Sequence, residues 1–314
     1  MYVARRSDFL FGAAAAGMAG AASTLVGGAA FGAAWVGSAV GLLVALAFAR
    51  RPLRRWRAVR QAFPEAWRAW LRAHVPLYAR ADGEARRRFE RDVQITLAEQ
   101  RFEAAAGAEV TDDLKLAVAA GAAVLLHGRP DWDLPTGRTI LFLPGRFDDS
   151  YDFDEDASFD GMVHPQGPVL FSIPAVEASW ENRDGYNVVL HELAHLFDFA
   201  AHGADGLPSL ADPASADAWM ALVREEMRKA RMGKSLLSSY AATAPAELFA
   251  VAVEQFFERP VRMHKHHPAL FEALVAFFQL DPRRYDGENE AFAPRESLMA
   301  RRWVAPEEPA EGGA

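Results

Sequence analysis

Two histidines and a glutamate form a pattern that could bind a metal ion and hydrolyse an amide bond. They are His191, Glu192 and His195, in the apolar segment NVVLHELAH at residues 187–195 of the 314-residue chain. In a helix the two imidazoles would lie within about 40° of each other on one face and could reach one ion at about 2.1 Å. Glu192 would project beside them, where its carboxylate could accept a proton from a metal-bound water and deliver it to a leaving amine. Burying these groups without partners would be costly, which disfavours an accidental match.

Two histidines leave a tetrahedral site short of one protein ligand, because catalytic zinc commonly has three protein ligands and a water. The apolar run after residue 245 offers two candidates, Glu247 and Glu254. They lie seven residues apart, so both share one face of a helix. One could bind the metal while the other orients a ligand histidine, and the spacing does not choose between them. Asp198, three residues after His195, is a further candidate for the orienting role.

Two other features suit hydrolysis of a peptide. Tyr240 shortly precedes the acidic pair and could donate its phenol to the oxyanion that forms when water attacks a carbonyl. The strand-like run at 169–173 could supply an exposed edge to which an extended peptide adds as another strand.

Composition limits the chemistry. The chain has no cysteine, which excludes thiol nucleophiles, thiolate zinc sites and iron–sulfur clusters, so a metal must be held by His, Asp or Glu. Its length and its 51% apolar content exclude a disordered chain. The net charge of −8 combines residues 1–60, with eight Arg and one Asp, and a remainder that carries −15. An acidic body argues against nucleic-acid binding.

The N-terminal region predicts a membrane anchor. Residues 9–49 contain no charged residue and no proline, a stretch longer than one membrane span requires. The pair Gly27-Gly28 divides it into spans 9–26 and 29–49, so we expect a transmembrane helical hairpin that contacts the lipid bilayer. Arginines precede and follow the stretch, which places both ends, and the catalytic body, on the cytoplasmic side of the inner membrane.

Two other interpretations of this region remain open. Arg5-Arg6 followed by Phe9 and an Ala/Gly run resembles a twin-arginine export signal, which would place the body in the periplasm. Two residues separate the arginine pair from Phe9 where that pattern usually has one, and a second apolar span follows, so we favour the hairpin. A soluble Ala-rich core helix is disfavoured, because the stretch offers no polar face to water.

The rest of the chain predicts a mostly helical α+β domain. Strands are expected at 139–143 and 169–173, and residues after 281 are charged, rich in Pro and Gly, and expected to be disordered. The expected domains are an anchor with a basic segment (1–61), a body (62–282) and a tail (283–314). Helices are expected at 63–78, 84–101, 111–126, 186–201, 214–232, 246–258 and 268–280.

Two polar clusters favour solvated surfaces over metal sites. The acidic loop at 148–161 lacks the ordered ligand spacing of an EF-hand, so we expect no calcium there. His264, His266 and His267 are expected on the surface, because adjacent histidines diverge at a helix exit.

Several sequence segments of the chain closely resemble those of the zinc peptidases related to Mlc titration factor A. The resemblance rests on residues 187–198, on SYAATAPAELFAV at 239–251 and on FFERP at 256–260. Upstream, FPE at 63–65, HVPLY at 74–78 and LAEQRF at 97–102 are also similar. The similarity covers about residues 62–282.

The resemblance implies a zincin-like metallopeptidase domain. In it His191, His195 and Glu247 hold Zn²⁺, Glu192 is the general base and Tyr240 stabilises the transition state. It also implies aminopeptidase-like activity on short peptides and, in one branch, association with a transcriptional repressor of sugar uptake. The added N-terminal segment departs from the family's namesake, which resembles a soluble protein.

A rival function is a zinc-containing binding protein that sequesters a regulator at the membrane, with catalysis secondary. Glu192 and Tyr240 favour the enzyme, because a purely structural zinc site would need neither.

Overall fold

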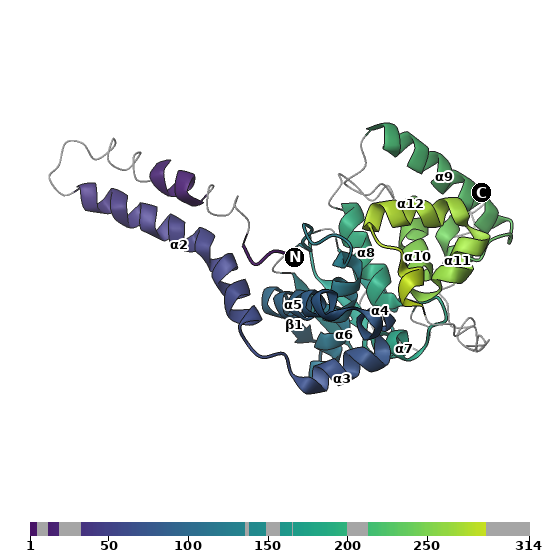
Figure 1. Cartoon of the computed structure of the whole chain (residues 1–314), viewed down its shortest axis with the longest axis horizontal. Coiled ribbons are helices and arrows are strands. Elements are labelled where there is room, and N and C mark those ends of the chain that lie inside the picture. Colours follow the sequence, from purple (N-terminus) through teal and green to yellow (C-terminus); the bar gives the residue numbers. More distant parts are fainter. Residues whose placement is uncertain are drawn as a thin grey trace, which may run out of the picture.

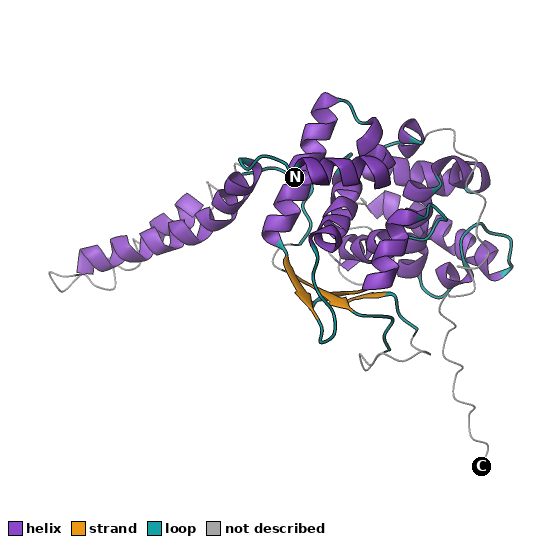
Figure 2. Ribbon diagram, turned by 90° about the horizontal axis from the view of Figure 1, so that it is seen from below, coloured by secondary structure: helices purple, strands orange, loops and turns teal. Residues whose placement is uncertain are grey.

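Helices predominate in the protein. The computed structural model describes residues 1–4, 12–18, 33–135, 138–148, 158–164, 166–199 and 213–286. In this part of the chain a four-stranded sheet lies along one side of the helical body (Figure 2). The long helix α2 (Ala33–Val59) projects away from that body (Figure 1). The predicted mostly helical α+β fold is confirmed.

Prolines set the start of several helices. Helices α4, α9, α10, α11 and α12 each begin at a proline, whose fixed φ suits the first helical position and whose missing N–H would have no helical partner there. This divides the single helix expected at 63–78, and it separates α11, which was not predicted, from α12. The bounds are α3 (Glu65–His74), α4 (Pro76–Arg80), α5 (Gly83–Glu99), α6 (Asp112–Leu126), α7 (Ile173–Glu181), α8 (Val188–Phe199), α9 (Pro213–Arg231), η1 (Ser239–Ala242), α10 (Pro245–Glu258), α11 (Pro260–His266), α12 (Pro268–Phe278) and η2 (Pro282–Tyr285).

The sheet has the strand order β1-β2-β4-β3. Strands β1 (Arg101–Ala104), β2 (Thr139–Leu143) and β4 (Val169–Ser172) are parallel, whereas β3 (Gly161–Val163) runs antiparallel to β4. The two strands expected from the sequence are confirmed. The exposed edge expected at 169–173 is wrong, because β4 is buried along its length and pairs with a strand on each side. The edge on that side of the sheet is β3.

Helix α6 packs between α5 and α8, and nearly all of its side chains are buried. It begins after Thr111, whose hydroxyl accepts the N–H of Leu114 at 3.2 Å and caps the helix. Its small residues let α8 approach closely, since a Cβ at Gly121 would lie 2.6 Å from Cγ1 of Val189. A side chain at position 121 would therefore displace the helix that carries the histidine pair.

Helix α2 is held to the body by two arginines in its second half. Arg55 is buried, and its guanidinium donates to the two carboxylate oxygens of Glu99 at 2.7 and 2.8 Å. Arg51 also donates to Glu99, at 2.8 Å, and both arginines reach Asp133. Part of the basic segment expected near the membrane surface is therefore bound by the body.

Residues 12–18 form a helix that packs on α2. A Cβ at Gly12 would lie 3.1 Å from Cβ of Phe48, and one at Gly41 would lie 3.1 Å from the carbonyl oxygen of Ala16. In the described part of the chain, no helix combines the length and the apolar character needed to cross a membrane. The described residues therefore do not support the predicted transmembrane hairpin. Residues 5–11 and 19–32, which belong to or flank the predicted spans, lie outside them.

The first residues of the predicted tail contact the body. Asp286 accepts a hydrogen bond from Arg183 at 2.8 Å, and the carbonyl oxygen of Tyr285 accepts one from Arg80 at 2.7 Å. Residues 283–286 thus belong to the packed body. Residues 287–314 lie outside the described residues, as do residues 149–157 of the acidic loop.

Candidate metal centre

Three side chains from two helices bring their donor atoms together. Nε2 of His191 lies 3.3 Å from Nε2 of His195, and Oε2 of Glu247 lies 3.1 Å from the first and 3.6 Å from the second. A tetrahedral ion with bonds of about 2.1 Å has ligand atoms about 3.4 Å apart, so the three atoms match one face of such a site. The group could hold a metal ion.

Helix α8 is fixed at its start by a buried asparagine. The side-chain oxygen of Asn187 accepts the N–H of Leu190 at 3.0 Å, which caps the helix, and its amide donates to the carbonyl oxygen of Ser179 at 3.0 Å. The Ser179 hydroxyl in turn accepts the N–H of Val188 at 2.9 Å. These bonds join α7 to α8 and set the position of the helix one turn before His191.

Glu254 lies behind His191, away from the three donor atoms. Its Oε1 is 2.8 Å from Nδ1 of His191, and its Oε2 accepts the N–H of Asn187 at 2.8 Å. With Nδ1 bonded to this carboxylate, Nε2 is left facing His195 and Glu247. The structure therefore gives different positions to the two acids that the spacing left equivalent.

The charges of the centre favour a cation. Burial alone would lower the pKa of His191, but the carboxylates of Glu247 and Glu254 raise it well above its usual range. Burial would raise the pKa of Glu247, yet its hydrogen bonds to His191 and His195 lower it strongly. Three carboxylates, those of Glu192, Glu247 and Glu254, surround the two imidazoles. A bound cation would balance their charge.

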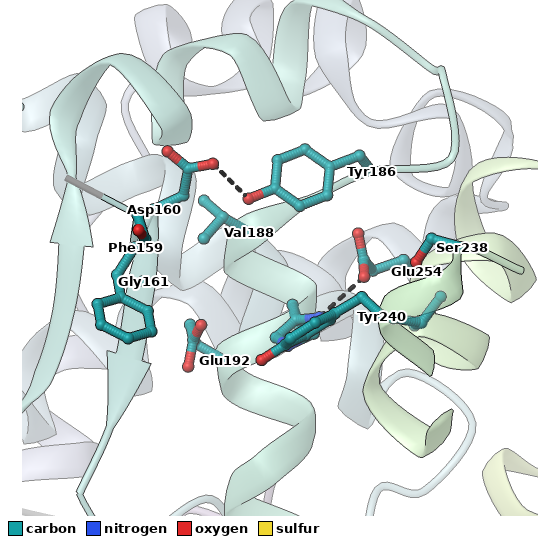
Figure 3. Close-up of a pocket in the computed structure, with 12 residues that line it drawn as sticks. Phe159, Asp160, Gly161, Tyr186, Val188, Glu192, Ser238, Tyr240 and Glu254 are labelled. Carbon is teal, nitrogen blue, oxygen red and sulfur yellow. Dashed lines mark hydrogen bonds and ion pairs between the residues drawn. The ribbon is translucent and has the colours of Figure 1, made fainter. Parts of the chain in front are cut away.

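Glu192 points into a pocket that His191 also lines (Figure 3). Its burial raises its pKa to about 7, although both histidines oppose the shift. The edge strand β3 passes directly over it, because a Cβ at Gly161 would lie 2.6 Å from Cγ of Glu192. Only glycine fits there without displacing the carboxylate or the strand.

Tyr240 faces the same pocket from η1, and its hydroxyl points toward Glu192 (Figure 3). The centre of its ring lies 6.0 Å from that of His191. Burial and the nearby charges of Glu247 and Glu192 raise the pKa of its phenol, which therefore stays protonated. The pocket encloses about 560 Å³ of space, part of it open to solvent.

Tyr186 and Asp160 also line this pocket, and the sequence analysis did not identify either of them. The Tyr186 hydroxyl donates to Oδ2 of Asp160 at 2.9 Å, and Arg146 lies 3.2 Å from the other oxygen of that carboxylate. Asp160 immediately precedes β3, so the pair ties the edge strand to the segment before α8. Neither residue belongs to a spaced motif, and the packing of β3 against β4 and α8 brings them together.

The other predicted residues fall elsewhere. Asp198 belongs to α8, but its side chain lies outside the described part of the structure. His264 is half-buried and His266 is exposed. His267 is buried, so its predicted surface position is wrong.

Comparison with known proteins agrees with this geometry. Residues 50–279 match the family described as glucose-regulated metallo-peptidase M90. The chain belongs to this family. The matched range contains all three donor residues, Glu192 and Tyr240, and family membership supports a metallopeptidase.

Relatives in other organisms are similar to this chain over different lengths. The uncharacterized protein slr2042 of Synechocystis sp. is 26% identical over 248 residues, 73% of this chain and 89% of that protein. Mlc titration factor A of Yersinia enterocolitica is 28% identical over 174 residues, 48% of this chain and 63% of that protein. Its counterpart in Edwardsiella ictaluri is 33% identical over 129 residues, 39% of this chain and 49% of that protein. The chain thus spans about half to two thirds of the length of these titration factors.

Proposed function

We propose that the chain is a zinc-dependent peptidase in which His191, His195 and Glu247 hold the metal ion. The observation that carries the proposal is the triangle of donor atoms, with edges of 3.1, 3.3 and 3.6 Å, beside a buried glutamate. Two imidazoles and one carboxylate with an open position are typical of catalytic zinc. When bound, zinc acts as a Lewis acid that activates water and polarises the substrate carbonyl.

The protein's own residues supply proton transfer and charge stabilisation. Glu192, with a pKa raised to about 7, accepts a proton from the attacking water and passes it to the leaving amine. Tyr240 donates its phenol proton in a hydrogen bond to the developing oxyanion. Glu254 keeps Nδ1 of His191 protonated, so that Nε2 carries the lone pair.

The substrate in this proposal is a short extended peptide with a free N-terminus. Strand β3 is at the edge of the sheet and passes over Glu192, so a peptide can add to it by backbone hydrogen bonds. The described residues that line the pocket include Asp160, Glu192 and Glu254 but no Lys or Arg. A lining of carboxylates without a basic side chain accepts a substrate that brings an ammonium group, as an aminopeptidase requires.

Removal and replacement of the metal tests the peptidase. We expect a chelator to abolish hydrolysis of unblocked peptides and one equivalent of zinc to restore it. N-acetylated peptides of the same sequence should be cleaved much more slowly. Hydrolysis that persists in metal-free protein would contradict the proposal, and equal rates on blocked peptides would contradict the aminopeptidase assignment alone.

We also propose that the N-terminal region attaches the enzyme to the inner membrane with the body in the cytoplasm. Support comes from α2, where large apolar side chains are exposed next to arginines. Leu42 and Leu43 are 61% and 66% exposed. Exposed apolar groups beside basic residues favour an anionic lipid surface. A reporter fused after Ala314 that is active only in the periplasm would contradict this orientation and favour export.

A regulator as partner is the alternative function. Some relatives carry the name Mlc titration factor A, so binding of a transcriptional regulator is proposed here by analogy. In that case a Glu192→Gln protein would keep its cellular role while losing hydrolysis. Loss of both would favour the enzyme.

A further inference from the structure

A buried histidine–glutamate pair lies outside the metal centre. Nδ1 of His267, at the junction of α11 and α12, is 2.6 Å from Oε2 of Glu226 on α9. Both side chains are 2% exposed. A fully desolvated pair of this kind needs defined partners on every polar atom, or it destabilises the fold.

The hydrogen bonds of His267 define its tautomer. Its Nε2 accepts the backbone N–H of Leu236 at 3.1 Å, so this nitrogen carries no proton. Nδ1 therefore carries the proton and donates it to Glu226. Burial alone would raise the pKa of Glu226, but hydrogen bonds from His267 and Lys229 lower it and keep the carboxylate charged.

The acceptor atom of His267 holds the segment that leads to Tyr240. Helix α9 ends in a turn at Gly233, whose φ of +66° suits glycine, and the chain then runs through Leu236 to η1. Leu237 is buried directly after the bonded amide. Tyr240, four residues beyond Leu236, reaches the pocket together with Ser238.

We propose that Glu226 and His267 are positioning residues that set Tyr240 over the metal centre. The carboxylate fixes the imidazole tautomer, the imidazole fixes the Leu236 amide, and the amide fixes the start of η1. Neither residue is among those that line the catalytic pocket. The inference rests on the proposed function, because it assigns the pair an effect on catalysis that passes through Tyr240.

The test compares variants that remove the bonds with one that keeps an acceptor. His267→Phe keeps a ring of similar size but loses the hydrogen bonds to Glu226, Leu236 and Ser235. His267→Gln instead keeps an oxygen that can accept the Leu236 N–H. His266→Ala is the matched control, since the neighbouring ring is exposed. For each, kcat and KM on an unblocked peptide, zinc content and amide hydrogen exchange of residues 236–243 are measured.

We expect His267→Phe to lower kcat by about 10- to 100-fold with KM and zinc content unchanged, because a small misplacement of a catalytic group has this effect. Amide exchange at 236–243 should become about tenfold faster. His267→Gln should recover most of kcat, and His266→Ala should match the wild type. In a Tyr240→Phe background, His267→Phe should cause no further loss of kcat.

Several results would overturn the inference. Unchanged kcat and exchange in His267→Phe, or a full additional loss in the Tyr240→Phe background, would mean that the pair does not act through Tyr240. If His267→Phe does not fold, the test passes to His267→Gln. A kcat about 10- to 100-fold below the wild type with wild-type amide exchange at 236–243 would then reject the inference. If the wild type cleaves no peptide, the proposed function fails separately, and unchanged exchange at 236–243 would still reject the positioning role.

Discussion

Most folded proteins bury apolar side chains and expose charged ones, and two regions of this protein depart from that rule in opposite ways. One region is helices α8 and α10, and the other is the projecting helix α2. Helices α8 and α10 bury titratable side chains, among them His191, Glu192 and Glu254. Helix α2 instead exposes large apolar side chains such as Leu42 and Leu43. Buried polar groups and exposed apolar groups are the informative exceptions in a folded protein. We interpret the first region as a metal centre and the second as a contact surface. Substitutions in the first should therefore affect zinc binding, catalysis or stability, and substitutions in the second should affect binding to a surface.

The largest effect on metal binding is expected at the proposed third metal ligand. Glu247→Ala should weaken zinc binding by more than about 100-fold, while Glu254→Ala, which removes only the support of His191, should weaken it by about 10- to 100-fold. Competition with a chromophoric chelator measures both. The reverse order would move the third ligand to Glu254.

Tyr240→Phe should reduce kcat by about 100-fold, because it removes one donor to the oxyanion. Zinc content and KM should stay close to those of the wild type, since the phenol is not among the three donor atoms. Steady-state kinetics on an unblocked peptide measures the effect. A variant with wild-type kcat would remove Tyr240 from the mechanism.

Asn187→Ala should lower the free energy of unfolding by about 2 kcal/mol, because it removes the cap of α8 and leaves buried groups without partners. Asn182→Ala is the matched control. Its half-buried side chain makes one weak bond to the carbonyl oxygen of Ala178, at 3.4 Å. Thermal unfolding of zinc-free protein separates this loss from any loss of metal. Equal effects at both positions would show that the cap does not hold α8.

The smallest effect on stability is expected in α2. The double variant Leu42→Gln, Leu43→Gln should change the free energy of unfolding by less than about 0.5 kcal/mol, since both side chains are exposed. Its binding to anionic lipid vesicles should nevertheless be weaker, which sedimentation of full-length protein measures. A large loss of stability with unchanged sedimentation would make α2 an element of the core and remove the contrast between the two regions.

The sequence was most informative where function depends on near neighbours in the chain. His191 and His195 share a helical turn, and Glu247 and Glu254 share one face of a helix. Their spacing alone therefore identifies them as candidate site residues. The same reasoning predicted α8, α10 and strands β2 and β4. It could not predict how β3 pairs with β4, so Gly161 and Asp160 were missed at the pocket. Strand order depends on contacts between distant segments, which local periodicity does not contain.

His267 shows the same limit within helices. Its cluster with neighbouring histidines favoured a solvated surface, but its partner Glu226 lies 41 residues earlier in the chain, on α9. A histidine at a helix junction can be buried only if such a partner exists, and the local sequence gives no sign of one. The spacing likewise could not choose between Glu247 and Glu254, although the family resemblance implied Glu247. The fold shows which carboxylate meets Nδ1 of His191 and which meets both Nε2 atoms.

In the proposed mechanism Glu192 performs proton transfer beside a zinc ion that three other residues hold. Hydrolysis of an unblocked peptide by Glu192→Gln protein, with zinc content determined on the same sample, tests it most directly. We expect one zinc per chain and a rate at least about 10³-fold below that of the wild type. A zinc-loaded Glu192→Gln protein that cleaves the peptide at the wild-type rate would contradict it.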